Sequence, residues 1–371
     1  MEISAVGKLT TQVLWAGFIL STLFGAIAQR SHFCTMGAVS DIVTMGDWTR
    51  MRMWGMAVGI AMIGFAALVA AGQIDPAKTL YASSRLIWLS ALVGGAMFGF
   101  GMVLASGCGS KTLVRVGGGS LKSLVVFVVM GVAAFATLKG VTAVVRVTTL
   151  DRVAVDFSVQ AALPNWVAAA LGLSPSTAGL VLALLMGLGL LFWALRGSGF
   201  LRFNNLLGGL GTGAIVTAMW WVSGHLGYIA EHPETLQEAF LATNSGRIEA
   251  LSFVAPFAYT LDWLMFFSDK SKVLTLGIVS VFGVVAGSAL VAIGSRSFHW
   301  EGFRDAKDTA NHLIGATLMG VGGVVAMGCT VGQGLSGIST LSAMSFIAVG
   351  AIIAGASVGL HFQIWSLERA L

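Results

Sequence analysis

The chain has 371 residues, of which 56% are hydrophobic and only 10% are charged, and its mean hydropathy is +0.88. Soluble domains carry about 25% charged residues, so this composition excludes a soluble globular protein and predicts an integral membrane protein in contact with lipid. The formal net charge of +5 fits an anionic substrate but also fits basic residues that anchor helices at lipid headgroups, and no nucleic-acid partner is expected.

Ten apolar segments approach the roughly 20 residues that a helix needs to cross the hydrocarbon layer. They lie at about 12–28, 54–72, 87–106, 121–138, 178–195, 206–223, 251–267, 273–294, 312–328 and 340–360. These runs are continuous and do not alternate between apolar and polar residues, as the strands of a membrane barrel do. The expected fold is therefore all-α, a polytopic helical membrane protein.

The segments between these runs add detail. The first run ends at Gln29 and Arg30 without a small-residue cleavage site, so it predicts a membrane helix and not a signal peptide. Residues 31–45 are too short and polar to span, which predicts a short or re-entrant helix. Asp262 lies near the end of an apolar run, where an ionisable side chain is either functional or caps the helix at the interface.

A polar connection at 146–177 divides the chain into an N-terminal membrane half, 1–145, and a C-terminal membrane half, 178–371. Trp166 in this connection suggests an interfacial helix. The C-terminal half also contains an acidic stretch at 224–250 that we expect to be soluble. Counting Lys and Arg in alternate loops of the ten-segment scheme gives 10 on one side and 11 on the other, so the count leaves the orientation open.

Two glycine-rich segments repeat each other at a constant offset of 221 residues. The matched positions are Gly94, Gly99, Gly101, Ala105, Gly107 and Cys108 in the first segment and Gly315, Gly320, Gly322, Ala326, Gly328 and Cys329 in the second. Dense glycine favours broken helices, which at membrane depth must be buried by protein or line water. We expect two pseudo-symmetric repeats with re-entrant half-helices around a central constriction, with Cys108 and Cys329 near the symmetry axis.

The three cysteines, Cys34, Cys108 and Cys329, show no Cys-x-x-Cys spacing and no histidine at metal-ligand spacing. A disulfide framework, a metal site and a cofactor are therefore not expected. Helix N-termini at broken helices favour anions, and neutral thiols are weak donors that hold an anion loosely. A buried cysteine is also a common packing residue. The repeat and its glycines favour a pathway role for Cys108 and Cys329 over packing, while Cys34 is equally well explained either way.

The residues around the cysteines complete the predicted site. The predicted pathway consists of Cys34, Cys108, Cys329, Gly107, Gly109, Gly328, Thr330 and Gln333. Three basic side chains, Arg30, Lys111 and Arg115, are candidates for steering an anion, and headgroup anchoring is the alternative role.

Three stretches resemble the YeeE/YedE sulfur-transport family: Phe33–Ala38, Phe98–Gly109 and Gly328–Gly337. The resemblance implies a bacterial inner-membrane permease, not an enzyme, for thiosulfate or a related sulfur anion, with an hourglass of membrane and re-entrant helices. It implies that Cys34, Cys108 and Cys329 relay the anion through S–H···S hydrogen bonds. It also implies a small sulfur-carrier protein of the TusA type as cytoplasmic partner.

Two other classes of function fit the same residues. A membrane thiol oxidoreductase would use Cys108 and Cys329 as a redox pair, although a resolving thiol close in sequence is missing. A channel for another small solute, such as a selenium compound, would use the same broken helices as a pore.

Overall fold

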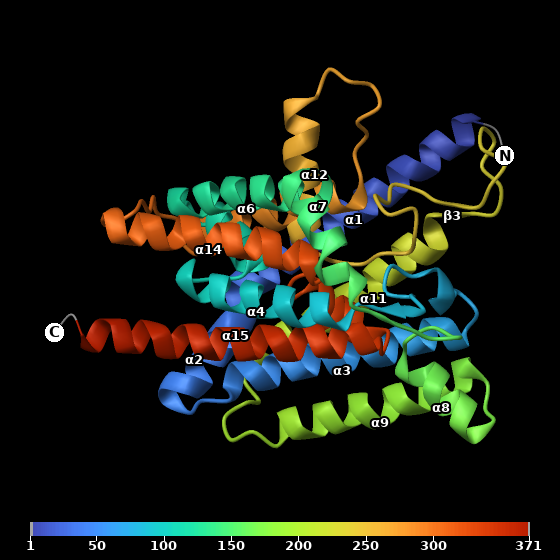
Figure 1. The fold of residues 1–371 in the computed structure, drawn as a ribbon, viewed down its shortest axis with the longest axis horizontal. Coiled ribbons are helices and arrows are strands. Elements are labelled where there is room, and N and C mark those ends of the chain that lie inside the picture. Colours follow the sequence, from blue (N-terminus) through green and yellow to red (C-terminus); the bar gives the residue numbers. More distant parts are fainter. Residues whose placement is uncertain (1–2, 370–371) are drawn as a thin grey trace.

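The computed structural model describes residues 3–369 as an almost entirely helical chain. Within this part of the chain, eight helical segments are long and apolar enough to cross a membrane. Most of the long helices run lengthwise in Figure 1, and the two ends of the chain lie at opposite ends of the molecule. The protein is therefore a multi-pass helical membrane protein, as its composition predicts.

The helices in chain order are α1 (Ile3–Ser31), α2 (Thr35–Met45), α3 (Thr49–Ala70), α4 (Trp88–Leu104), α5 (Gly109–Gly117), α6 (Leu121–Lys139), α7 (Val141–Thr148), α8 (Leu163–Leu171), α9 (Pro175–Leu195), α10 (Phe203–Leu206), α11 (Thr212–Trp221), α12 (Val254–Met265), α13 (Leu276–Gly294), α14 (Ala306–Val325) and α15 (Ala343–Glu368). Short 3₁₀ or π turns are η1 (Pro76–Lys78), η2 (Leu150–Arg152), η3 (Leu207–Gly211), η4 (Val222–Leu226) and η5 (Gly332–Gly337). Two small antiparallel pairs join β1 (Arg85–Leu86) to β2 (Val155–Asp156) and β3 (Tyr228–Ile229) to β4 (Ala239–Phe240).

One of the ten expected spans is corrected. The run at 251–267 forms α12, which has 12 residues and projects from the side of the bundle in Figure 1. The run at 312–328 belongs to α14, a helix of 20 residues that packs against α4 and runs lengthwise in Figure 1, although its polar first turns make it less apolar than the eight segments above. In α12, Asp262 is 2.6 Å from the Lys272 ammonium, so this carboxylate forms an ion pair near the helix end.

Side-chain caps set where several helices begin. The Ser120 hydroxyl accepts the N–H of Ser123 at the start of α6, and Ser174 does the same for Thr177 at the start of α9. The Asp305 carboxylate accepts the N–H of Asp308 at 2.7 Å where α14 begins. Each cap satisfies a backbone donor that would otherwise lack a partner in lipid or protein.

Helices α4 and α14 cross where glycines bring their backbones into contact. A Cβ on Gly94 would lie 2.5 Å from the backbone nitrogen of Ala326, and a Cβ on Gly315 would lie 2.7 Å from that of Ala105. The offset of 221 residues relates one contact to the other, because Gly94 matches Gly315 and Ala105 matches Ala326. The crossing is thus a small-residue interface of the kind that lets membrane helices approach closely.

The two cysteine segments also share their backbone conformation. Ser106 and Met327, which match at the same offset, are non-glycine residues with φ angles of 56° and 57°. The N–H of Gly107 bonds to the Met102 carbonyl at 2.8 Å, and that of Gly328 bonds to the Gly323 carbonyl at 2.7 Å. Both helices therefore end in the same left-handed turn immediately before a cysteine.

Each repeat segment is followed by backbone pairing with a distant loop. The N–H of Leu121 bonds to the Glu301 carbonyl at 2.8 Å. The N–H of Ala343 bonds to the Ala161 carbonyl at 3.0 Å, which ties the start of α15 to the connection at 146–177. In that connection, the Trp166 ring packs 5.3 Å from the Phe157 ring.

Lysine and arginine are unevenly divided between the two ends of the molecule. Twelve lie toward the end that carries the C-terminus: Arg30, Arg50, Arg52, Lys111, Arg115, Lys122, Arg196, Arg202, Arg296, Arg304, Lys307 and Arg369. The other nine lie toward the other end, including two on the loop between α12 and α13: Lys8, Lys78, Arg85, Lys139, Arg146, Arg152, Arg247, Lys270 and Lys272. The near-equal count in the ten-segment scheme arose because that scheme treated α12 as a span.

Candidate functional site

Each of the three cysteines stands at the start of a helix. Cys34 is the N-cap of α2, Cys108 is the N-cap of α5, and Cys329 lies just before η5. The chain reaches Cys108 and Cys329 through the left-handed turns that end α4 and α14, so the glycine-rich segments position both thiols in the same way. A helix start carries unpaired N–H groups and a partial positive charge, which makes these positions favourable for an anion.

A backbone N–H three residues further on donates to two of the three thiols. Gly37 N–H donates to the Cys34 sulfur and Gly332 N–H to the Cys329 sulfur, both at 3.4 Å. The Cys108 sulfur instead lies 3.3 Å from the Ser110 hydroxyl. All three cysteines are free thiols. Each sulfur atom thus lies against an uncharged polar group, which suits the passage of a small anion.

The thiols form one contiguous group. The Cys34 and Cys108 side chains are neighbours, and Cys108 is also 3.3 Å from the Ser110 hydroxyl. Cys108 and Cys329 are both fully buried and lie near each other. We call Cys34, Cys108, Thr330 and Cys329 the thiol group, since the Thr330 side chain lies against Cys108.

Thr330 and Gln333 have different roles in this group. The buried Thr330 hydroxyl has no hydrogen-bond partner of normal geometry in the part of the chain that the structure describes, although it lies next to the Cys108 thiol. The amide of Gln333 instead donates to the Ala326 carbonyl at 2.7 Å and accepts from the Ser345 hydroxyl at 2.6 Å. Thr330 therefore keeps a free polar group at the site, while Gln333 fixes the loop that carries Cys329.

The three glycines beside the cysteines are not equivalent. Gly328 has a φ of +158°, a backbone conformation that glycine adopts readily and other residues rarely do. Gly107 has no such angle, and a Cβ there would meet only the Lys111 side chain, at 3.3 Å. Gly109 has room for a Cβ, whose nearest neighbour would be Phe253 at 3.6 Å. Backbone conformation thus calls for glycine at position 328 and not at 107 or 109.

A polar cavity of about 290 Å³ opens on one side of the thiol group. We call it the basic vestibule; its lining residues include His32, Cys34, Arg50, Ser106, Lys111 and Arg115. Three cationic side chains thus surround a cavity that reaches Cys34 and the turn before Cys108. Such a cavity attracts anions by its field.

The sequence identified two of these cations and missed the third. Lys111 and Arg115 lie on α5 and line the vestibule as expected, whereas Arg30 lies outside its lining, 5.7 Å over the Phe203 ring. Arg50 comes from the first turn of α3 and is 3.2 Å from the Asp41 carboxylate. The basic residues of 47–52 were visible in the sequence, but only the folding of α2 back onto α3 brings Arg50 to Cys34.

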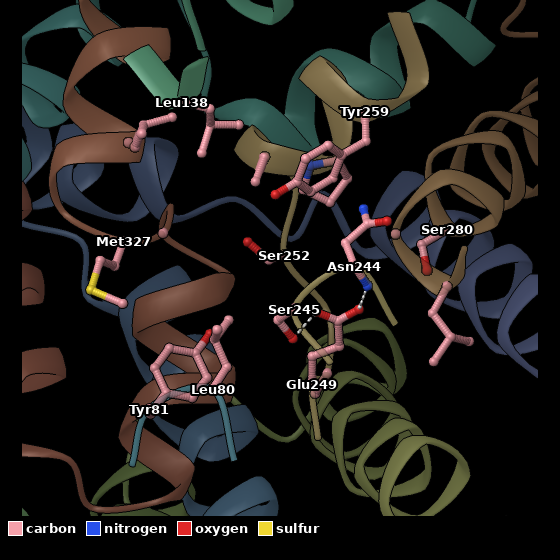
Figure 2. A pocket seen from close by; sticks show the side chains of 18 of the residues that line it. Leu80, Tyr81, Leu138, Asn244, Ser245, Glu249, Ser252, Tyr259, Ser280 and Met327 are labelled. Carbon is pink, nitrogen blue, oxygen red and sulfur yellow. Dashed lines mark hydrogen bonds between the residues drawn. The ribbon is translucent and has the colours of Figure 1, made fainter. Parts of the chain in front are cut away.

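A second cavity, of about 210 Å³, is lined by Met327 and Gly328, the two residues before Cys329 (Figure 2). We call it the Glu249 vestibule; its lining residues include Tyr81, Glu249, Ser252, Tyr259, Met327 and Gly328. In Figure 2 the Glu249 carboxylate faces the cavity and is hydrogen-bonded to residues 244 and 245. Sequence reasoning did not single out Glu249 or Tyr81.

Tyr81 links this vestibule to the thiol group. Its hydroxyl donates to the Gly332 carbonyl at 2.6 Å, and Gly332 is the residue whose N–H meets the Cys329 sulfur. A neighbouring cavity of about 200 Å³ is also lined by Tyr81 and Met327, together with Gln333. Both openings on this side thus end at residues adjacent to Cys329.

The arrangement places the thiol group beside two separate cavities of a helical membrane bundle, one lined by Cys34 and the other by the residues before Cys329. These features define a membrane transport protein with a narrow polar waist. The match to a protein family agrees with this class: residues 30–358 match the model of the Sulphur transport family, so the chain belongs to that family.

Two curated relatives align over most of the chain. The thiosulfate transporter TsuA of Escherichia coli (strain K12) is 27% identical over 330 residues, which cover 87% of this chain and 87% of that protein. The thiosulfate transporter TsuA of Spirochaeta thermophila is 27% identical over 354 residues, which cover 91% of this chain and 94% of that protein.

Proposed function

We propose that this protein takes up thiosulfate, or a closely related small sulfur anion, by passing it along the thiol group from one vestibule to the other. The observation that carries the proposal is that one vestibule is lined by Cys34 and the other by Met327 and Gly328, directly before Cys329, and that both thiols accept a main-chain N–H. The two relatives named thiosulfate transporters support the choice of anion.

The chemistry of the thiol group fits weak binding of the anion at one site after another. Thiols and a hydroxyl donate weak, uncharged hydrogen bonds, so each site holds the anion long enough to replace lost water but releases it to the next. The unpartnered Thr330 hydroxyl beside Cys108 is satisfied when an anion is present at this point. The protein needs no covalent step in this scheme, and we propose that it acts as a permease and not as an enzyme.

The division of basic residues supports an orientation. Cytoplasmic loops of membrane proteins carry an excess of Lys and Arg, and the end with the C-terminus has twelve of these residues against nine at the other end. We therefore place the C-terminus in the cytoplasm and the N-terminus outside. The Glu249 vestibule then receives the anion and the basic vestibule delivers it to the cytoplasm, where a sulfur-carrier protein of the TusA type is the proposed acceptor.

The two halves 1–145 and 178–371, joined by 146–177, are proposed as pseudo-symmetric repeats around the waist. The reciprocal contacts of Gly94 and Gly315 and the matching turns at Ser106 and Met327 support this organisation. Re-entrant half-helices carrying Cys108 and Cys329 to the middle of the membrane belong to the same proposal.

The test is uptake of ³⁵S-thiosulfate by cells that lack other thiosulfate importers. We expect Cys108→Ala and Cys329→Ala each to reduce uptake at least about tenfold, since each removes a donor from a single-file path, and Cys34→Ala to reduce it less because Cys34 is partly exposed. Membrane content, measured by immunoblot, is expected to be unchanged.

Three outcomes would contradict the proposal. Wild-type uptake by both Cys108→Ala and Cys329→Ala would rule out the relay. Equal competition by a selenium compound, with no competition by thiosulfate, would indicate another solute. A Cys108–Cys329 disulfide released by reductant during turnover would indicate a thiol oxidoreductase.

A further inference from the structure

The Glu249 carboxyl lies in the vestibule that the proposed function assigns to anion entry. It accepts the N–H of Asn244 at 3.2 Å and the hydroxyl of Ser245 at 3.1 Å, while its own N–H donates to the Ser223 hydroxyl at 3.0 Å. These bonds hold the side chain so that it faces the cavity, as Figure 2 shows. An anion that enters here therefore passes a fixed carboxyl group before it reaches Cys329.

The surroundings of Glu249 provide no compensating cation. In the part of the chain that the structure describes, no ion pair includes Glu249. Arg146 also lines the vestibule but is 3.2 Å from the Asp151 carboxylate, and Arg247 on the same loop donates to the carbonyls of Thr79 and Ala82. Burial accordingly raises the pKa of Glu249 to about 7.

The other titratable groups that face this carboxyl do not titrate in the same pH range as Glu249. Tyr81 and Tyr259 line the same cavity, and phenols titrate near pH 10. The remaining titratable side chain of the lining is Arg146, which is paired with Asp151, while Cys329 lies outside the lining, next to Gly328. Within the physiological range, Glu249 is therefore the group whose charge changes at this entrance.

We propose that Glu249 is a specificity-determining residue that must be protonated for the anion to occupy this vestibule, so that anion binding takes up a proton. The reason is electrostatic. Thiosulfate is a dianion throughout the physiological range, and a carboxylate fixed in the same small cavity repels it, whereas a neutral carboxyl donates a hydrogen bond to it. By linkage, a ligand that binds the protonated form alone draws a proton onto Glu249. The inference rests on the proposed function.

The direct test is ³⁵S-thiosulfate binding to the purified protein between pH 5.5 and 8.5. We expect the Kd of the wild-type protein to be nearly constant below pH 6.5 and to rise about tenfold per pH unit well above pH 7, since one proton is bound with each anion. The variant Glu249→Gln keeps the shape and the acceptor oxygen of the side chain but cannot ionise, and we expect its Kd to vary less than about twofold across the range.

The matched control is Glu238→Gln, in the same 224–250 stretch. Glu238 is paired with Lys78 outside the vestibule, so this variant should keep the wild-type pH profile. A second measurement uses a weakly buffered solution with a pH-sensitive dye: adding thiosulfate at pH 7.5 should remove about one proton per bound anion from solution for wild-type protein and none for Glu249→Gln.

The outcomes separate this inference from the proposed function. Thiosulfate binding with a pH-independent Kd, or with no proton uptake by the wild-type protein, would overturn the role of Glu249 and leave transport intact. An unchanged pH profile in Glu249→Gln would overturn it as well. Absence of thiosulfate binding by wild-type protein at every pH would instead overturn the proposed function. If Glu249→Gln does not fold, proton uptake by the wild-type protein still decides the question.

Discussion

The segments around Cys108 and Cys329 share a backbone but differ in the residues that come after each cysteine. After Cys108, α5 carries Lys111 and Arg115 into the basic vestibule. After Cys329, η5 contains only uncharged residues and is buried throughout. The comparison indicates that the glycines and the left-handed turns fix where the thiols lie, while the residues behind each thiol determine the charge of the path. The two segments thus place their thiols in the same way but differ in the charge of the residues that follow.

The largest expected effect tests whether the two segments are equivalent in packing. Gly94→Val and Gly315→Val each place side-chain atoms into the backbone of the opposite helix, at Ala326 or Ala105, and should destabilise the protein by about 3 kcal/mol or prevent its folding. The measurement is thermal unfolding in detergent, followed by tryptophan fluorescence and size-exclusion chromatography.

The control for this pair is Gly350→Val in α15, where a Cβ would meet nothing within 4 Å. It should unfold close to the wild-type temperature. A large loss of stability in only one of the two variants, Gly94→Val or Gly315→Val, would show that the two segments do not contribute equally to the packing.

The next largest effect is a difference in stability between variants of the two residues that hold the cysteine loops in place. Gln333 and Thr112 occupy the same position at the offset of 221 residues, but Gln333 makes two buried side-chain hydrogen bonds, whereas Thr112 makes one, to the Cys108 carbonyl at 3.1 Å. We expect Gln333→Ala to lower the free energy of unfolding by about 2–3 kcal/mol and Thr112→Val by about 1 kcal/mol or less. Thermal unfolding in detergent measures both, and equal losses would contradict this difference.

The smallest effect concerns charge in the basic vestibule. Lys111→Gln and Arg115→Gln should slow exchange of labelled thiosulfate across proteoliposome membranes about threefold at low salt, because each removes a cation that attracts the anion. The difference from wild type should shrink at about 0.5 M salt, where screening acts over a few ångströms.

Lys307→Gln is the matched control for the two vestibule variants, since Lys307 lies toward the same end but outside the vestibule lining. It should exchange thiosulfate at the wild-type rate at every salt concentration. Equal slowing by all three variants would point to a general surface effect, and no slowing by Lys111→Gln or Arg115→Gln would favour a headgroup-anchoring role for those residues.

These comparisons also show how far the sequence could predict the molecule. The repeat offset and the glycine pattern singled out Cys108 and Cys329, and the structure gives both the same preceding turn, because backbone constraints recur in sequence. Hydropathy counted α12 as a span, since it measures how apolar a run is and not how long its helix becomes. Without α12 as a span, the distribution of Lys and Arg between the two ends changes.

Two side chains of the site escaped prediction for a physical reason. Arg50 reaches the basic vestibule through the fold of α2 onto α3, and Glu249 reaches its vestibule from a stretch that also holds Glu231, Glu234 and Glu238. Only tertiary structure distinguishes Glu249 from these three. The one local signal is that Glu249, unlike them, directly precedes the apolar stretch that begins at Ala250.

The contact between α4 and α14 has a consequence for how the two helices can move. Because main chain meets main chain at both ends of the crossing, no side chain can turn aside to open a gap there. Any widening at this level requires separation of two whole helices. In the proposed transport scheme, this rigid contact would limit the path to molecules small enough to pass beside two helices that do not separate.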